Sequence, residues 1–146
     1  MLTIRNFTKR IISRRFILKI SKFVLAQEQI AAGGFSLVVV GQKRMAALNK
    51  MYRRKKGPTD VLAFSEREAS SIFPRVSLDQ GLGEIVVCLD IIKKNSKKYG
   101  VSFQRELVRI VIHGILHLIG YDHERSKKAA EEMSKKENSY FQQLIN

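Results

Sequence analysis

The segment after Ser102 constrains the fold most, because it is a long helical run that is apolar on almost every side. Its apolar positions are Leu107, Ile110, Val111, Ile112, Ile115, Leu116, Leu118 and Ile119. A helix that is apolar all round is buried at the centre of a domain. The sequence therefore predicts a fold whose other elements surround this helix, which begins after Ser102 and is ended by Gly120.

Two histidines interrupt this apolar helix, and a third follows it. His113 and His117 are four residues apart, so their imidazoles project from one face, about one turn apart. The turn through Tyr121 and Asp122 can bring His123 back to the same place. Buried imidazoles need polar partners, and one metal ion satisfies several at once. Three imidazoles without a thiolate predict a zinc site in which a fourth position stays open, as in catalytic sites.

The spacing of the three histidines also matches the zinc helix of the metzincin proteases. Those enzymes place a glutamate directly after the first histidine as the general base. This chain has Gly114 there, and glycine cannot transfer a proton. A metzincin-like metalloprotease is therefore only a minor alternative, and Gly114 is expected to allow close packing or substrate approach at the metal.

The rest of the chain has the pattern of an α+β protein with a small sheet. Apolar, β-branched runs predict strands at residues 2–4, 35–40, 60–64 and 83–89. Helical spacing predicts helices at 11–26, from 45 into the basic run at 53–56, at 91–99 with Asp90 as N-cap and Gly100 at its end, and at 125–144. Residues 66–82 are expected to form an irregular loop. Without a linker or repeat, residues 1–146 are expected to be one domain.

The positive charge lies almost entirely in the first part of the chain. Residues 1–56 contain fourteen Lys and Arg but one acid, Glu28, whereas residues 57–146 contain thirteen basic and twelve acidic residues. Such asymmetry is typical of contact with nucleic acid or a membrane surface. An acid-free start rich in Arg and Ser also suits a transit peptide or a membrane-surface helix. We favour a packed helix and a polyanionic partner, because the periodic pattern continues without a linker.

Two further features limit the class of protein. Cys88 is the single cysteine, so it cannot form an internal disulfide, which favours a reducing compartment. No apolar run approaches the roughly 18–20 residues that cross a bilayer. We therefore expect no disulfide-linked partner and no membrane partner, and a location in the cytoplasm, or in an organelle matrix for a eukaryotic chain.

The run His113-Gly-Ile-Leu-His117-Leu-Ile-Gly120-Tyr-Asp-His123 resembles the signature of the YbeY family at every fixed position. The family's central basic segment and strand also have counterparts, which are Leu48-Asn49, Tyr52-Arg53, Pro58-Thr59-Asp60-Val61-Leu62, Phe64 and Gly83-Glu84-Ile85. The chain departs from the family's usual Ser, Pro and Asp at Ala63, Ser65 and Glu84. None of these three positions is a predicted metal ligand.

The resemblance implies a metal-dependent, single-strand endoribonuclease of ribosomal RNA maturation. It also implies a small mixed sheet packed against helices, with the metal-binding helix buried at the centre. Arg53 stands at the position of the family's functional arginine, and a guanidinium binds phosphate with two hydrogen bonds. Catalysis is therefore assigned to Arg53, His113, His117 and His123.

Other residues complete the predicted site. With Arg53, the cations of Arg54, Lys55 and Lys56 are expected to hold the RNA backbone. Asp122 is expected either to accept a hydrogen bond from a ligand imidazole or to cap the final helix. One Zn²⁺ per chain is expected, and the attacking group, water or the RNA 2′-OH, is left open.

Two functions from different classes follow from these patterns. The first is a zinc-dependent endoribonuclease of small-subunit ribosomal RNA processing and ribosome quality control, with single-stranded RNA, ribosomal RNA and ribosomal particles as partners. The second is a basic RNA- or ribosome-binding module in which the three-histidine metal is structural. Cleavage of single-stranded RNA with and without a chelator distinguishes them.

Overall fold

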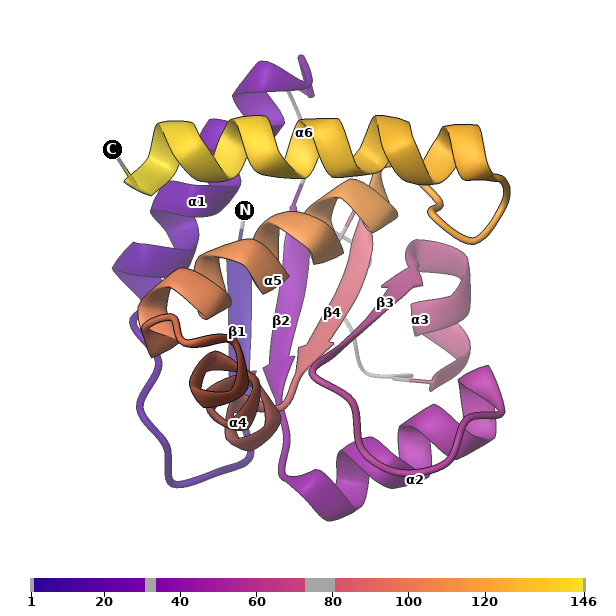
Figure 1. The fold of residues 1–146 in the computed structure, drawn as a ribbon. Coiled ribbons are helices and arrows are strands. Elements are labelled where there is room, and N and C mark those ends of the chain that lie inside the picture. Colours follow the sequence, from indigo (N-terminus) through magenta and orange to yellow (C-terminus); the bar gives the residue numbers. More distant parts are fainter. Residues whose placement is uncertain (1, 31–33, 73–80, 146) are drawn as a thin grey trace.

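A computed structural model describes residues 2–30, 34–72 and 81–145, in which helices cover both faces of a four-stranded sheet (Figure 1). The strands are β1 (Leu2–Asn6), β2 (Phe35–Val39), β3 (Val61–Ser65) and β4 (Gly83–Val87). The helices are α1 (Arg14–Gln27), α2 (Gln42–Arg53), α3 (Glu66–Ile72), α4 (Leu89–Tyr99), α5 (Phe103–Leu118) and α6 (Lys127–Ile145). None of the helices in the described part is long and apolar enough to cross a membrane.

The sheet is mixed, as the resemblance implies, with the strand order β1-β2-β4-β3. β1 pairs in parallel with β2, and β2 with β4, whereas β3 runs antiparallel to β4. Every residue of β2 and β4 is buried. Strands that are buried along their whole length are covered on both faces, so the sheet separates two cores.

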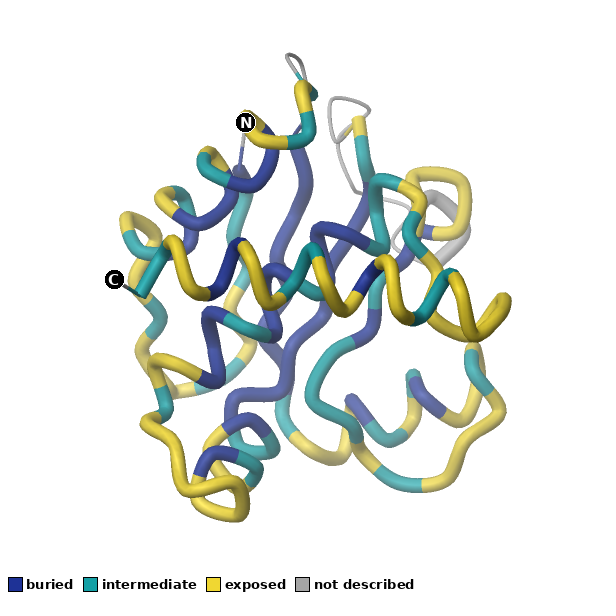
Figure 2. Tube along the Cα trace, turned by 45° about the horizontal axis from the view of Figure 1, so that its top comes forward, coloured by how far each residue is buried: buried dark blue, intermediate teal, exposed yellow. Residues whose placement is uncertain are grey.

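The larger core lies between the sheet and the helices α1, α5 and α6. There Leu37 and Ile85 of the sheet contact a cluster that includes Ile112 and Ile115 of α5. The smaller core lies on the opposite face and includes Met45 of α2. Between residues 106 and 116 of α5, all positions are buried except 109 and 113, and Figure 2 shows this helix and the strands as the buried centre. The predicted central helix is confirmed.

Both ends of α5 are fixed by local hydrogen bonds. Ser102 is the N-cap, and its side chain accepts a hydrogen bond of 3.1 Å from the backbone N–H of Arg105. At the other end Gly120 has φ +114°, a conformation that glycine adopts without strain. Its N–H donates to the carbonyl of His117 and the N–H of Tyr121 to that of Leu116. This paired closure reverses the chain directly after His117.

Some predicted boundaries were wrong. The first helix begins at Arg14, with Ser13 as its N-cap, so residues 11–13 precede it. α4 begins at Leu89, with Cys88 as its N-cap, and the Leu89 side chain is buried in the first turn of the helix. Asp90 therefore lies in the first turn, where it pairs with Arg10.

The predicted loop at 66–82 was also wrong in part, because residues 66–72 form α3. The Ser65 hydroxyl accepts a hydrogen bond from the N–H of Glu68, and the Glu68 carboxylate accepts one from the N–H of Ser65, both 3.4 Å long. This reciprocal pair is a capping box. Residues 73–80 of the expected loop lie outside the described residues.

Candidate metal centre

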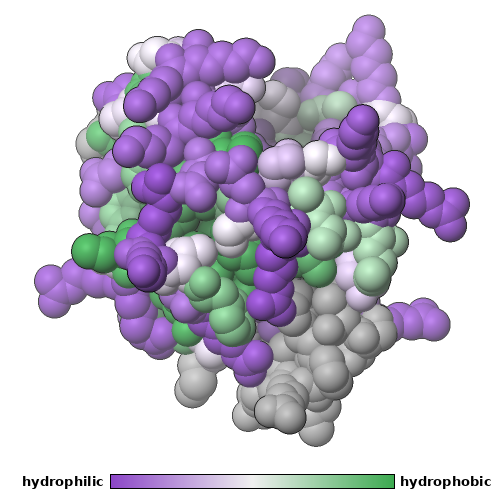
Figure 3. All heavy atoms as spheres, turned by 90° about the horizontal axis from the view of Figure 1, so that it is seen from below, coloured by the Kyte–Doolittle hydropathy of each residue, from purple (hydrophilic) through white to green (hydrophobic). Residues whose placement is uncertain are grey.

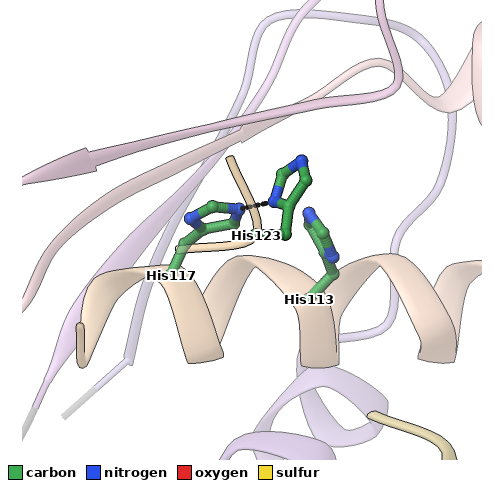
Figure 4. Close-up of side chains that lie close together, drawn as sticks. All are labelled: His113, His117 and His123. Carbon is green, nitrogen blue, oxygen red and sulfur yellow. Dashed lines mark hydrogen bonds between the residues drawn. The ribbon is translucent and has the colours of Figure 1, made fainter. Parts of the chain in front are cut away.

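The structure brings the three histidines together. His113 and His117 project from the same side of α5, and the loop after α5 places His123 opposite them (Figure 4). One ring nitrogen from each residue lies within 4.8 Å of the others. His117 Nε2 and His123 Nδ1 are 3.0 Å apart. The predicted convergence of the rings is confirmed.

The spacing of these nitrogens fits a divalent ion. Zinc–nitrogen bonds of 2.0–2.1 Å in a tetrahedral site put ligand nitrogens about 3.4 Å apart. One pair of nitrogens is 3.0 Å apart and all three lie within 4.8 Å of one another, so small ring rotations would bring the three donors onto one ion. In the described part of the chain, the donors that gather here are these three alone. A four-coordinate ion would therefore keep one position for another ligand.

Glu137 of α6 holds the first histidine ring. Its Oε1 makes a hydrogen bond with His113 Nδ1, which directs the other nitrogen, Nε2, to the site. A carboxylate behind a ligand imidazole fixes the tautomer and makes the ring a better donor. Sequence reasoning missed Glu137. The available signal was its place on the apolar side of α6, four residues after buried Met133.

The environment keeps the second ring neutral. Burial, together with the neighbouring His113 and His123, lowers the pKa of His117 to about 4, although Asp122 and Glu137 oppose the shift. Near neutral pH the His117 ring is therefore unprotonated. Metal ions bind the neutral imidazole, so this ring is in its ligand form without a large proton release.

Asp122 lines the same cleft as the histidines, but its hydrogen bond lies elsewhere. Its Oδ1 accepts a hydrogen bond of 2.9 Å from the N–H of Glu124, so it shapes the loop, and the carboxylate beside a ligand ring is that of Glu137. It does not cap the final helix either, because Ser126 accepts the hydrogen bond from the N–H of Ala129 at 3.0 Å.

The histidines lie in a cleft of about 550 Å³ between α5 and β3. Two of the four predicted RNA-binding cations, Arg53 and Lys55, line the same cleft. Arg54 and Lys56 are exposed and are absent from its lining. α2 ends at Arg53 because Arg54 takes a left-handed conformation with φ +57°. The basic run therefore leaves the helix at the edge of the cleft.

The Arg53 side chain is held by its neighbours. Its Nη2 donates to the carbonyl of Ala63 at 2.7 Å, and its Nη1 lies 3.2 Å from the carboxylate of Glu68. The guanidinium carbon is 4.7 Å from the centre of the Phe64 ring. The side chain is still about one-third exposed. A fixed, partly exposed guanidinium in a cleft is suited to receive an anion.

Comparisons with known proteins agree with this geometry. The model of the family described as "Endoribonuclease YbeY" matches residues 3–145. A protein named Endoribonuclease YbeY from Petrotoga mobilis is 38% identical over 138 residues, which cover 93% of this chain and 89% of the relative. One of the same name from Chlorobaculum tepidum is 33% identical over 143 residues, covering 98% and 97%.

A solved structure has the same fold. The solution structure of TM1509 from Thermotoga maritima matches 97% of this chain and 87% of its own, with a TM-score of 0.63 and 29% identity. The match therefore extends over nearly the whole of this chain. From the family match over nearly the whole length, and from relatives above 30% identity, we conclude that this chain belongs to the YbeY endoribonuclease family.

Proposed function

We propose that this protein is a zinc-dependent endoribonuclease that cuts single-stranded RNA during ribosomal RNA maturation. The observation that carries the proposal is the placement of three convergent imidazoles and one fixed arginine in a single cleft. Family membership supports the ribonuclease activity, and the signature at 113–123 supports ribosomal RNA as the substrate. Residues 1–146 would act as one domain, in the cytoplasm or an organelle matrix.

Each cleft residue has a distinct role in this proposal. His113, His117 and His123 bind the ion, and Glu137 orients the first of them. When bound, such an ion polarises a phosphoryl oxygen and lowers the pKa of water, so that a deprotonated nucleophile is available near neutral pH. Arg53 would bind the non-bridging oxygens of the scissile phosphate, where negative charge increases in the transition state.

The surface charge supports RNA as the substrate. Exposed cations occur on α2 and α4 at Lys43, Arg44, Lys93, Lys94, Lys97 and Lys98. Figure 3 shows hydrophilic side chains over much of the face that contains these two helices. Cations spread along a surface bind the phosphate backbone with little sequence preference. Together with Arg54, Lys55 and Lys56, they would hold RNA on either side of the cut.

The test is cleavage of a single-stranded RNA by zinc-loaded protein, with its duplex as the competing substrate. We expect cuts in the single strand only, loss of cutting in a chelator and recovery when Zn²⁺ is restored. Arg53→Ala should lower the rate constant by about 100-fold or more. Arg15→Ala removes an exposed arginine of α1 outside the cleft lining and should leave the rate unchanged.

Other outcomes would contradict the proposal. Metal-loaded protein that binds RNA tightly but never cuts it would support the binding module with a structural metal. Chelator-sensitive hydrolysis of peptides, without any effect on RNA, would support the metalloprotease. Cutting that is unaffected by the chelator would show that the three-histidine site takes no part.

A further inference from the structure

Glu28 joins three distant parts of the chain, one of which is the turn that leads to His123. It follows the last residue of α1, and its side chain is only 9% exposed. Oε1 accepts a hydrogen bond of 2.8 Å from the hydroxyl of Tyr121. Oε2 accepts hydrogen bonds from the hydroxyl of Tyr140 and, at 3.1 Å, from the ammonium of Lys136. The carboxylate thus connects α1, α6 and the turn after α5.

The position of Glu28 is not explained by helix stability. A carboxylate at the C-terminal end of a helix opposes the helix dipole, and this one is the only acid among the first 56 residues. Burial alone raises the pKa of Glu28, but the hydrogen bonds from Tyr140, Tyr121 and Lys136 outweigh burial and lower it. The carboxylate is therefore ionised and fully engaged at neutral pH.

Tyr121 makes this cluster relevant to the metal site. It lies one residue after Gly120, where the chain leaves α5, and two residues before His123. His113 and His117 are fixed by a buried helix, but His123 is exposed and sits on a loop. The Tyr121 ring packs against the larger core, and its hydroxyl adds a hydrogen bond that ties the start of this loop to Glu28. Further along the loop, Glu124 contacts Lys55. Without the hydroxyl contact, the start of the loop keeps the packing of the Tyr121 ring and the backbone hydrogen bonds at Gly120 and Tyr121, but it loses its link to α1.

We propose that Glu28 is a positioning residue for the metal centre: by holding Tyr121, it orders the turn that presents His123 before the metal binds. The proposal rests on the proposed metal site and adds a residue that touches none of the ligands. Ordering the third ligand in advance removes part of the entropy cost of binding. Loss of the anchor should therefore weaken metal binding without changing the ligand set.

The main test compares two matched variants. Tyr121→Phe and Tyr140→Phe each remove one hydroxyl from the same carboxylate, but only Tyr121 belongs to the turn. Zn²⁺ affinity is measured by competition with a chromophoric chelator, without RNA. We expect affinity to fall about tenfold for Tyr121→Phe, the loss of one hydrogen bond to a charged group, and less than about twofold for Tyr140→Phe. Equal losses in both variants would indicate a purely structural cluster and overturn the proposal.

A double-mutant cycle tests whether Glu28 acts through Tyr121. Glu28→Ala should weaken Zn²⁺ binding about as much as Tyr121→Phe, and the double variant should be no weaker than Glu28→Ala alone. Additive losses would contradict the proposal. Amide hydrogen exchange at residues 120–124 of the metal-free protein should be faster in Tyr121→Phe than in Tyr140→Phe, and equal rates would overturn it.

These readouts separate this proposal from the proposed activity. If the wild-type protein binds Zn²⁺ and the variants lose affinity as expected, but no RNA is cut, the anchor is supported and the ribonuclease is contradicted. If RNA is cut but the variants do not differ in Zn²⁺ affinity, the ribonuclease is supported and the anchor is contradicted. If the wild-type protein binds no Zn²⁺, the metal centre itself is wrong and the anchor has no metal site to serve.

Discussion

At the scale of single residues, Glu137 is the carboxylate behind a metal ligand. Glu137→Gln keeps the size of the side chain but removes its charge, so His113 becomes a weaker donor. We expect Zn²⁺ affinity to fall roughly tenfold, at the lower end of the effect of such outer partners. Chelator competition measures it, with Glu131→Gln, an exposed acid of the same helix, as the control. Equal affinity in the two variants would mean that Glu137 does not act on the ligand.

Glu84 gives a second residue-scale prediction, because its side chain is fully buried in β4. Burial raises its pKa from 4.5 to about 7, although Arg5 and Ser36 act in the opposite direction. The folded protein then holds a proton that the unfolded chain releases above pH 4.5, so this residue's contribution to stability falls as pH rises towards 7.

Replacing Glu84 with Gln should remove this pH dependence. Glu84→Gln should be more stable than the wild type at pH 8 by an amount on the order of 3 kcal/mol, and the difference should disappear near pH 4. Urea unfolding at several pH values measures it. If the wild type and the variant have parallel stability curves between pH 4 and 8, Glu84 does not titrate as its burial requires.

The sequence shows the ligands but not the residues that support them. His113 and His117 could be predicted because their spacing on an apolar helix is a local pattern. Glu137 and Glu28 act on partners 24 and 93 residues away in the chain. The signal for Glu137 was an acid on the apolar side of α6, and the signal for Glu28 was a single acid in a basic region. Neither signal indicates which residue the acid contacts.

At the scale of elements, Gly114 sets how closely α5 approaches the sheet. A Cβ at this position would lie 3.0 Å from Cγ2 and 3.1 Å from Cδ1 of Ile85, which is fully buried in β4. The expectation that Gly114 allows close packing is thus supported. Gly114→Ala gains about 1 kcal/mol of helix propensity but crowds a packed core, which costs typically 1–3 kcal/mol.

We therefore expect Gly114→Ala to lower the free energy of unfolding by about 1 kcal/mol. In the background of Ile85→Ala the contact is absent, so the same substitution should be stabilising. Chemical denaturation of the four proteins gives both values. The same sign in both backgrounds would show that contact with Ile85 does not determine the effect.

The element predictions failed where the pattern was short. α3 has few buried positions, with Ala69 the buried residue among those described, so no apolar stripe marks it. The capping box formed by Ser65 and Glu68 was the signal that sequence reasoning missed. The long amphipathic and apolar helices were predicted because several turns repeat the same pattern.

At the scale of the whole molecule, the uneven charge should control RNA binding. Phosphate contacts from Arg53, Arg54, Lys55 and Lys56 alone predict a slope of about −3 in a plot of log affinity against log salt for single-stranded RNA, and contacts from α2 and α4 would make it steeper. Replacing Lys55 and Lys56 with Gln should reduce the slope by about 1.4. Fluorescence anisotropy over a salt series measures both slopes. A flat dependence would mean that the basic surface contacts something other than a nucleic acid.

Strand order could not be read from periodicity. The order β1-β2-β4-β3 places β4 between strands that precede it in the chain, and this pairing depends on contacts across the whole molecule. The α+β class followed from the local patterns, whereas the mixed sheet followed only from the family resemblance. That resemblance rests first on residues 113–123, where the local pattern and the metal site coincide, and then on the matching segments between residues 48 and 85.

The crystal structure of the zinc-loaded protein, with anomalous scattering at the zinc edge, tests the central claim most directly. We expect one Zn²⁺ per chain, bound by nitrogens of His113, His117 and His123 at about 2.0–2.1 Å. A non-protein ligand should fill the remaining position and face Arg53. A fourth protein side chain on the ion, or histidine rings that bind no common ion, would contradict a catalytic three-histidine centre.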